Sequence, residues 1–370
     1  MHFAISLLNF RPGMIGGTET YLRELVAHIP EALKESPEDR VTVIMDREAA
    51  RDLKTPGLGR AVLDRPAAAL IRARALEAFT PWRDRRVEKL FAELELDATL
   101  FPQQSIYPKR VAGRAVVTVC DLQHLILPEN IARADRLFRR MIYPYSLARA
   151  DRIISISQYT TQTLVEYCGL TEGEIDIVLH GFETPGQVDA TPWSPVELPF
   201  IYYPAVARPH KNHLTLIESL AVLHQRDSNT PHLVLSGQQT PYWGTIRRRI
   251  DELGLTDHVT HVGYVTREQV QGLYLAAQAV VFPTRFEGFG LPITEAVAAG
   301  ARIICSRLMV FEELGVPDRL RIDFEDPEAL ANALGEPPPF DLERAPVSWV
   351  DAARETLQVL RKATVASRRR

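Results

Sequence analysis

The stretch FPTRFEGFGLPITEAVAAG, residues 282–300, decides the fold. An apolar strand is expected to end at Pro283, and a loop that carries Glu287 between glycines and aromatic residues follows. A helix is then expected, with Pro292 in its first turn and Gly300 at its end. Glycines let a ligand approach the loop backbone closely, and the free amides at a helix start bind anions such as a diphosphate. A buried strand, a glycine loop and a helix together form the unit of a parallel α/β sheet.

Two glutamates belong to this stretch. Glu287 lies on the loop and Glu295 is expected in the first helical turn, so both can face one ligand. Carboxylates beside an anion site are unfavourable unless they bond sugar or ribose hydroxyls. A simpler interpretation, an acidic first turn that complements the helix dipole, accounts for Glu295. It leaves Glu287 and the flanking glycines unexplained, and this favours a functional site.

The same strand–loop–helix rhythm runs through the first half of the chain. Apolar runs predict strands at residues 3–8, 41–45, 98–101, 115–119, 152–157 and 175–179. Residues 18–28 have the apolar spacing of a helix. Continuous rather than alternating apolar runs predict a parallel sheet covered on both faces by helices.

A second series follows a segment at 183–199 that is rich in proline and polar residues and predicts a linker. Strands are expected at 201–207, 232–236, 259–264, 279–283, 302–305 and 321–324, with helices between them. The predicted fold is α/β, with two Rossmann-like parallel-sheet domains at 1–183 and 200–347 that face each other across a cleft. A last helix at 348–366 is expected to pack across the domains.

Composition excludes several classes of protein. The chain of 370 residues has 46% hydrophobic and 24% charged residues and a net charge of −4, so it lacks the basic excess of a nucleic-acid binder. Its three cysteines are far apart, which argues against a disulfide framework or a zinc site and favours the cytoplasm. The apolar start of the chain predicts a strand rather than a signal peptide, and no run of eighteen apolar residues is present to span a membrane.

The motif E-G-F-G-L-P-x-x-E-A resembles that of the retaining family-four glycosyltransferases, which have the GT-B fold. Further resemblances occur in the same order along the chain: Gly16, Gly17, Thr18 and Glu19; His210, Lys211 and Asn212; Ser348 and Trp349. The opening PHKNH of the second domain is similar to bacterial mannosyltransferases of this family. The resemblance therefore implies a hexosyltransferase, with GDP-mannose as the first donor expected.

The resemblance implies a role for each matching residue. Glu295 would bind the donor ribose, and Glu287 would contact hydroxyls of the donor sugar. Lys211 would neutralise the departing diphosphate, whose developing charge must be stabilised; the simpler alternative is a solvated lysine. The family often has an arginine five positions before this lysine, where Val206 stands here, and Arg208 is the nearest substitute.

Several backbone segments complete the implied donor site. Amides of Gly288, Phe289, Gly290 and Leu291 would lie against sugar and phosphate. The loop with Gly16 and Gly17 would offer a second surface near the transferred sugar. Tyr264 and Val265 resemble the segment whose backbone contacts the nucleotide base, although a plain strand end explains them equally well.

One position departs from the family. Where the family commonly has histidine and aspartate after a strand, this chain has Cys120 and Asp121, with His124 three residues on. Asp121 and His124 are therefore the candidate catalytic residues of the first domain, while a turn-capping histidine is the alternative. Cys120 and Val206 also motivate another hypothesis, a non-catalytic nucleotide-sugar-binding partner subunit. An epimerase or a phosphorylase of the same fold is a further alternative, but a pyridoxal lysine and a longer chain are not evident.

The expected partners are a nucleotide sugar and a glycan or lipid-linked acceptor, without nucleic acid. No metal and no cofactor are expected, because no Asp-x-Asp signature stands at a strand end. Two arginine-rich segments with aromatic residues, 71–89 and 133–152, suit a lipid head group at the inner face of a membrane. A solvated helix face is the alternative, since acidic residues are interspersed.

Overall fold

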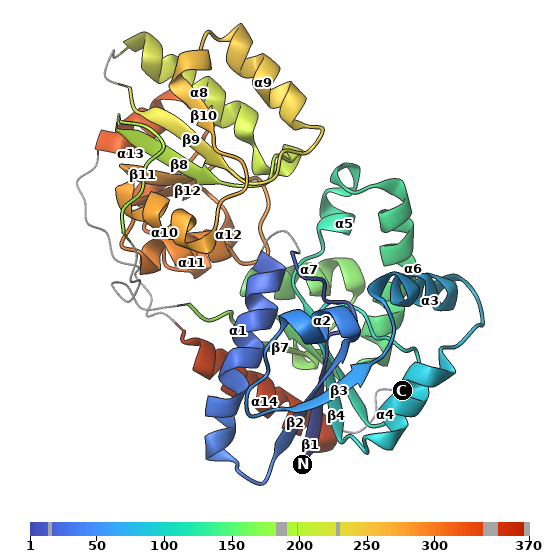
Figure 1. Cartoon of the computed structure of the whole chain (residues 1–370). Helices are drawn as coiled ribbons and strands as arrows, with labels where there is room; N and C mark the ends of the chain where they lie inside the picture. The colour runs from blue at the N-terminus through green and yellow to red at the C-terminus, as the bar shows by residue number, and fades with distance from the viewer. Residues whose placement is uncertain (14–16, 183–190, 198, 227–229, 336–346, 366–370) are drawn as a thin grey trace. The chain divides into compact units, whose positions relative to one another are not determined.

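The chain folds into two units, each built on a parallel sheet. A computed structural model describes residues 1–13, 17–182, 191–197, 199–226, 230–335 and 347–365. The first unit contains Met1–Gly181 and Val347–Arg370, and the second contains Phe182–Pro346. Both sheets are entirely parallel and carry helices between their strands, so the predicted α/β class is confirmed (Figure 1).

The sheet of the first unit has seven strands in the order β3-β2-β1-β4-β5-β6-β7. Their bounds are β1 His2–Ser6, β2 Arg40–Asp46, β3 Gly59–Leu63, β4 Ala98–Phe101, β5 Arg114–Val119, β6 Arg152–Ser155 and β7 Ile175–Ile177. In the central register, Phe3 of β1 stands beside Val41 of β2 and Ala98 of β4. These apolar side chains are fully or almost fully buried, as expected for a sheet covered on both faces.

Helices connect the strands of the first unit. They are α1 Gly17–Ala32, α2 Arg47–Asp52, α3 Ala67–Phe79, α4 Arg85–Glu93, α5 Gln123–Ile126, α6 Arg133–Arg149, α7 Gln158–Cys168 and α14 Trp349–Val365. The last of them, α14, packs against α1 and against strands β4 to β6 of the same unit, and α3 contacts α6 (Figure 1).

A close backbone contact anchors the start of α14. A Cβ atom on Gly181 would lie 2.4 Å from the backbone nitrogen of Trp349, so the two segments can meet only because residue 181 is a glycine. Beside it, the ring of His180 stacks on Trp349 at 5.9 Å and on Tyr21 of α1 at 4.3 Å. Burial lowers the pKa of His180 to about 3, so the ring packs as a neutral aromatic group.

The second unit has a six-stranded sheet in the order β10-β9-β8-β11-β12-β13. The strands are β8 Phe200–Pro204, β9 His232–Ser236, β10 Val259–His261, β11 Ala279–Phe282, β12 Ile303–Ser306 and β13 Arg321–Ile322. The helices are α8 His213–Arg226, α9 Trp243–Glu252, α10 Arg267–Ala276, α11 Leu291–Ala298, α12 Met309–Glu313 and α13 Pro327–Gly335. None of the described helices is long and apolar enough to cross a membrane.

Candidate active site

The order of strands in the second unit places one ligand-binding edge. Strand β8 lies between β9 and β11, so successive connections leave it in opposite directions. Open parallel sheets bind ligands outside the carboxyl ends of the strands at such a reversal. The loop after β8 leads into a 3₁₀ turn, Pro209–Lys211, and the loop after β11 carries Glu287.

These two loops bring Lys211 and Glu287 together, although they are 76 residues apart in sequence. Lys211 Nζ donates to Glu287 Oε1 at 2.5 Å, and both side chains remain about one fifth exposed. A lysine in direct contact with a glutamate is not the freely solvated lysine of the simpler interpretation. The pair is open enough to meet a ligand and buried enough to be held in place.

The backbone on both sides of the pair is cross-linked. The carbonyl of His210 accepts hydrogen bonds from the amide of Arg285 at 2.8 Å and from the hydroxyl of Thr284 at 3.2 Å. The hydroxyl of buried Tyr203 donates to the carbonyl of Lys211 at 2.8 Å. These bonds hold the loops after β8 and β11 in a fixed register, which pre-organises the charged pair.

Burial keeps the neighbouring histidine neutral. The pKa of His210 is lowered to about 3, first by burial and then by the positive charges of Lys211 and Arg208. The site therefore takes its positive charge from lysine rather than from imidazole. Arg208 is exposed. That it substitutes for the arginine that the family often has at the position of Val206 stays a prediction.

The glycine loop enters α11 through a left-handed residue. Gly290 caps the helix with a φ of 105°, and a Cβ atom there would lie 3.0 Å from the ring of Phe311. Glycine is thus required by both conformation and space. Pro292 lies in the first turn as predicted, but Glu295 is the fifth residue of the helix, and the first turn has no acidic residue. The expected first-turn position of Glu295 is wrong because α11 begins immediately after Gly290.

Glu295 has a tyrosine partner that the sequence did not single out. The hydroxyl of Tyr274, from α10, forms a hydrogen bond with Glu295. Burial and then the nearby charge of Glu295 raise the pKa of Tyr274, and the same charge contributes to the raised pKa of Tyr202 on β8. Since Glu295 sits in the second turn, dipole compensation does not explain it, and a tyrosine donor orients the carboxylate instead.

The other residues expected at the donor site lie around the same sheet edge. Gly288, Phe289, Gly290 and Leu291 join Glu287 directly to α11. The carbonyl of Gly263 accepts from the amide of Gly237, after β9, at 2.8 Å, which places the following residues beside this edge. Tyr264 there is 86% exposed and Val265 is half-buried. The ligand contacts of these two residues stay predictions. Gly272 belongs to the packing of the unit: a Cβ atom there would lie 2.7 Å from a backbone oxygen.

The first-unit candidates form a second group. Gly16 lies outside the described residues, and Gly17 begins α1. Asp121 Oδ1 accepts from the amide of Gln123 at 2.9 Å and so begins the short helix α5. His124 on that helix is 3% exposed and meets the ring of Tyr143 edge-on at 4.9 Å. Asp121 therefore bonds the backbone at the start of this helix, and His124 packs on an aromatic side chain.

Two further observations concern the same loop. Burial lowers the pKa of His124 to about 4, aided by the charge of Arg139, and its Nδ1 has no hydrogen-bond partner among the described residues. Burial also raises the pKa of Cys120 to about 12, so its side chain is a neutral thiol. Neither the neutral imidazole of His124 nor the thiol of Cys120 carries a charge. Of the two, only the imidazole has a strong hydrogen-bonding atom.

We expect Cys120→Ala to retain activity within a few-fold, whereas His124→Ala or Asp121→Ala lowers turnover by about 10²-fold, as loss of a positioned polar group does. The measurements are transfer rate and donor hydrolysis for each variant, with circular dichroism as a control for folding. Active variants at all three positions would show that this loop stays clear of the sugar. A silent wild type that gains activity with Cys120→His would favour the non-catalytic partner subunit.

Among the described residues, no group of three histidine, cysteine, aspartate or glutamate side chains is placed to hold a metal ion. The three cysteines are free. The candidate site of the second unit thus contains Lys211, Glu287 and Glu295 together with tyrosine hydroxyls, near the carboxyl edge of the sheet.

This arrangement defines a class: an α/β protein of two Rossmann-like units with a polar, sugar- and phosphate-compatible site on the second. Residues 15–184 match the family described as Glycosyltransferase Family 4, and residues 192–336 match Glycosyl transferases group 1. A glycosyltransferase family model thus matches each unit of the chain, and the fold is that of GT-B glycosyltransferases. The resemblance drawn from its motifs is confirmed.

Two curated relatives are similar to part of this chain. O-antigen chain mannosyltransferase B of Escherichia coli is 29% identical over 136 residues, which cover 36% of this chain and 35% of the relative. O-antigen chain mannosyltransferase RfbU of Salmonella typhimurium is 30% identical over 126 residues, covering 34% and 35%. The matched part of the chain thus spans about a third of each relative.

Solved structures agree with the fold over almost the whole chain. Sucrose-phosphate synthase from Thermosynechococcus elongatus has a TM-score of 0.66 at 20% identity and covers 98% of this chain and 96% of its own. HepE of Anabaena, in complex with UDP and glucose, has a TM-score of 0.62 at 18% identity and covers 97% and 95%. At these identities the likeness concerns the fold.

Proposed function

We propose that the protein is a retaining, metal-independent hexosyltransferase that moves mannose from GDP-mannose to a glycan or lipid-linked glycan. The observation that carries this proposal is the contact between Lys211 and Glu287 at the carboxyl edge of the second sheet. The two mannosyltransferase relatives support the sugar, and the structural neighbour with bound UDP and glucose supports a nucleotide-sugar donor.

The side chains divide the work of such a transfer. The ammonium of Lys211 would shift from Glu287 to the donor diphosphate and stabilise the charge that develops as the bond to the sugar breaks. The released carboxylate of Glu287 would accept hydrogen bonds from sugar hydroxyls, and Glu295 would accept them from the ribose. Retention comes with the family resemblance: the incoming acceptor oxygen would attack from the face that the phosphate leaves, without an enzymatic nucleophile.

Binding and product analysis test this proposal together. GDP and GDP-mannose should raise the melting temperature in a concentration-dependent way, by more than UDP and UDP-glucose do. Transfer should yield an α-linked product from the α-linked donor, which is read from the one-bond coupling between C1 and H1 in the NMR spectrum. A larger shift with UDP-sugars would overturn the donor, and a β-linked product would overturn retention.

We expect transfer activity to survive EDTA unchanged, within about twofold. The reason is that Lys211 is a fixed cation at the proposed diphosphate position, so the leaving group is neutralised without a divalent ion. Initial rates with and without chelator, followed by addition of Mg²⁺ or Mn²⁺, provide the measurement. Complete loss that either ion restores would contradict this mechanism.

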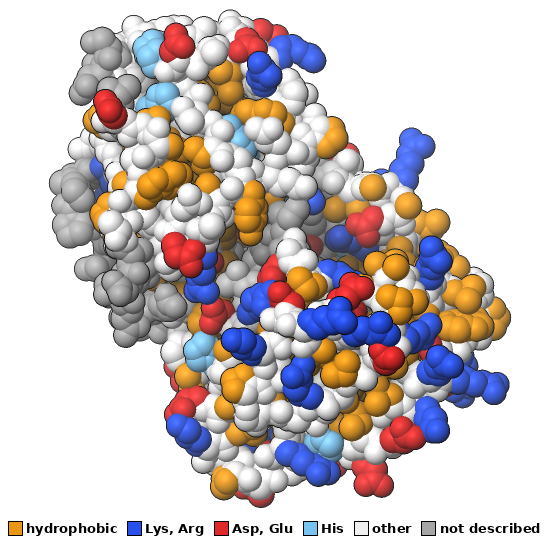
Figure 2. Space-filling model, viewed as in Figure 1, with side chains coloured by type: hydrophobic (Ala, Val, Ile, Leu, Met, Phe, Trp, Pro, Cys, Tyr) orange, Lys and Arg blue, Asp and Glu red, His pale blue; other side chains and the backbone are white. Residues whose placement is uncertain are grey.

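We also propose that the first unit contacts the inner face of an anionic membrane. The structure places the two arginine-rich segments side by side, because α3 contacts α6 and the ring of Phe79 meets Phe138 at 6.4 Å. Large apolar side chains on these helices are exposed by 44–55%: Ile71, Leu76, Phe79, Leu137 and Met141. Figure 2 shows hydrophobic side chains gathered on this side of the unit with lysine and arginine side chains around them.

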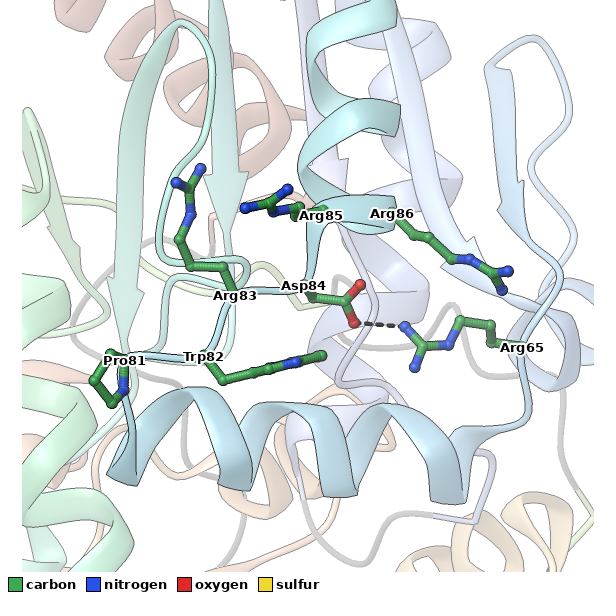
Figure 3. Close-up of a pocket in the computed structure, with 7 residues that line it drawn as sticks. All are labelled: Arg65, Pro81, Trp82, Arg83, Asp84, Arg85 and Arg86. Carbon is green, nitrogen blue, oxygen red and sulfur yellow. Dashed lines mark hydrogen bonds and ion pairs between the residues drawn. The ribbon is translucent and has the colours of Figure 1, made fainter.

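The loop between α3 and α4 adds an aromatic and a basic component to this surface. Figure 3 shows a pocket at the start of α4 that is lined by Trp82, Pro81 and five charged residues. The side chain of Trp82 is 40% exposed. The carboxylate of Asp84 holds this pocket together: it accepts hydrogen bonds from Arg65 at 2.5 Å and from the hydroxyl of Tyr107 at 2.7 Å. Arg85 and Arg86 remain exposed. Such amphipathic side chains and arginines suit an interface with anionic head groups.

We expect the double variant Ile71→Ser and Leu137→Ser to bind phosphatidylglycerol vesicles about tenfold more weakly, because apolar area is lost from the surface. The double variant Arg85→Gln and Arg86→Gln should lose at least as much at low salt, since each arginine contributes about 1 kcal/mol. Vesicle co-sedimentation is the measurement. Tyr167→Ser, an exposed residue of α7, is the matched control. Equal binding of all variants would exclude this surface.

A further inference from the structure

The first unit has its own reversal of strand order. Strand β1 lies between β2 and β4, so the loops after β1 and β4 meet at the edge where parallel sheets bind ligands. Asn9 follows β1 and Ser105 follows β4, and the side-chain nitrogen of Asn9 donates to Ser105 Oγ at 3.2 Å. These two residues therefore mark the ligand-binding edge of the first sheet.

An arginine reaches this edge from α3. Arg74 Nη2 donates to Ser105 Oγ at 2.8 Å, and its guanidinium lies over the rings of Phe138 at 5.5 Å and Tyr107 at 6.0 Å. Among the described residues, no carboxylate forms an ion pair with Arg74. Glu77, one turn further along α3, accepts instead from the amide of Lys109 at 3.1 Å. Burial lowers the pKa of Arg74 to about 10, and the charge of Glu77 opposes this shift only in part.

A second arginine approaches the same place from α6. The guanidinium of Arg139 lies over the ring of Tyr143 at 5.9 Å, and Tyr143 packs on His124. Burial raises the pKa of Tyr143, and the charges of both Arg139 and Arg74 oppose that rise, so both guanidinium groups act on this hydroxyl. The acidic groups near Arg139 are Asp135, at 3.0 Å and half-exposed, and Asp121, whose Oδ1 already accepts from Gln123.

Unpartnered polar atoms gather around the two arginines. In the part of the chain that the structure describes, buried atoms without a hydrogen-bond partner include Arg11 Nε, Arg139 Nε, His124 Nδ1 and Asn9 Oδ1. Two of these are guanidinium donors. A buried donor without an acceptor destabilises a protein, and functional sites are where such atoms are retained. The two guanidinium N–H groups among these atoms lack an acceptor, and a group rich in acceptor oxygens would supply one.

We propose that Arg74, Arg139, Tyr143 and Ser105, here called the arginine site, bind a phosphate group carried by the acceptor substrate. This inference rests on the proposed glycosyl transfer and adds the chemical class of its acceptor: a sugar phosphate or a lipid-linked sugar phosphate. Guanidinium groups bind phosphate through paired N–H donors, and a dianion matches two cations better than a singly charged carboxylate does. The hydroxyls of Ser105 and Tyr143 supply further donors.

Calorimetric titration of the full chain with mannose 1-phosphate tests the arginine site. We expect Arg74→Gln and Arg139→Gln each to weaken binding at least tenfold, because each removes a charged donor. Arg72→Gln is the matched control: it removes the same charge from an exposed position of α3 and should change affinity less than twofold. The titration is also run with saturating GDP, which keeps the sugar phosphate out of the proposed diphosphate position beside Lys211 and so separates the two sites.

Three comparisons assign the ligand. Mannose without phosphate should bind at least tenfold more weakly than mannose 1-phosphate, and mannuronate should bind more weakly as well. Isoprenyl phosphate in phosphatidylcholine vesicles tests the lipid-linked source. If Arg74→Gln weakens binding of this lipid more than it weakens binding of mannose 1-phosphate, the acceptor is lipid-linked. If it weakens binding of mannose 1-phosphate more, the acceptor is soluble. Tighter binding of mannuronate, or wild-type affinity in both arginine variants, would overturn the inference.

The outcome is separable from that of the proposed function. If nucleotide sugars fail to bind but mannose 1-phosphate binding depends on Arg74 and Arg139, the glycosyl-transfer proposal falls and the arginine site stands. If nucleotide sugars bind and the arginine variants bind mannose 1-phosphate as the wild type does, only the arginine site falls.

Discussion

Replacing Lys211 with alanine should lower kcat by about 10²–10³-fold, the usual effect of removing one preorganised electrostatic contact to a developing charge. The reason lies in its position: Nζ is 2.5 Å from Glu287 at the edge of the second sheet, and its backbone is held by Tyr203. The charge of the leaving diphosphate rises as the sugar bond breaks, so the lysine should act more on turnover than on sugar recognition. Steady-state kinetics with GDP-mannose provide the measurement.

Three companion variants sharpen this experiment. Lys211→Arg keeps the charge and should recover part of the lost rate. Glu287→Gln removes the partner carboxylate, and it should raise KM for the donor sugar as well as lower kcat if the carboxylate binds sugar hydroxyls. Arg249→Ala breaks an exposed ion pair between Arg249 of α9 and Glu218 of α8, and it is the control. Wild-type turnover in Lys211→Ala would show that the Lys211–Glu287 contact is only a surface ion pair.

Replacing Glu295 with alanine should weaken nucleotide binding by about 1.5–3 kcal/mol, or roughly 10–150-fold in Kd. The expected contact is a pair of charge-assisted hydrogen bonds from ribose hydroxyls to the carboxylate. The structure adds that Glu295 is half-buried in the second turn of α11 and bonded to the hydroxyl of Tyr274. Calorimetry with GDP measures the change without the need for an acceptor.

Two further variants separate contact from positioning. Glu295→Gln keeps the shape and should lose less affinity than alanine does. Tyr274→Phe removes the hydroxyl that orients the carboxylate, so it should weaken GDP binding by several-fold without touching the ligand. The 2′-deoxy form of GDP should bind the wild type more weakly than GDP does. For Glu295→Ala, the two nucleotides should have equal affinity. Unchanged affinity for GDP in a folded Glu295→Ala would remove this residue from the nucleotide site.

The local conformation of the segment that carries Glu287 and Glu295 was largely predicted, because it depends on residues close together in the chain. The loop around Glu287, Pro292 in the first turn of α11 and the end of the helix near Gly300 all follow local rules of chain conformation. The edge strand β3 was not predicted: most of its residues are exposed or half-exposed, and a short, weakly apolar segment lacks the continuous pattern of a central strand.

The roles that depend on distant partners escaped the sequence. Nothing local to Tyr274 or Tyr203 indicates that one bonds Glu295 and the other holds Lys211, since each contact joins separate strands or helices. The same is true of Arg74: its segment suggested a basic surface, but its bond to Ser105 and its lack of a carboxylate partner arise from the packing of α3 against the loop after β4.

By itself the sequence determined the class of fold, the two parallel sheets and the resemblance to glycosyltransferases, and it singled out the charged residues of the proposed donor site. These depend on hydrophobic periodicity and on turn chemistry, which act over a few residues and can be recognised along the chain. The tertiary structure alone decided which of those charges meet, which are buried and which lack partners. Electrostatic energies depend on distance and on exposure to water, and both are set by strand order and packing rather than by position in the sequence.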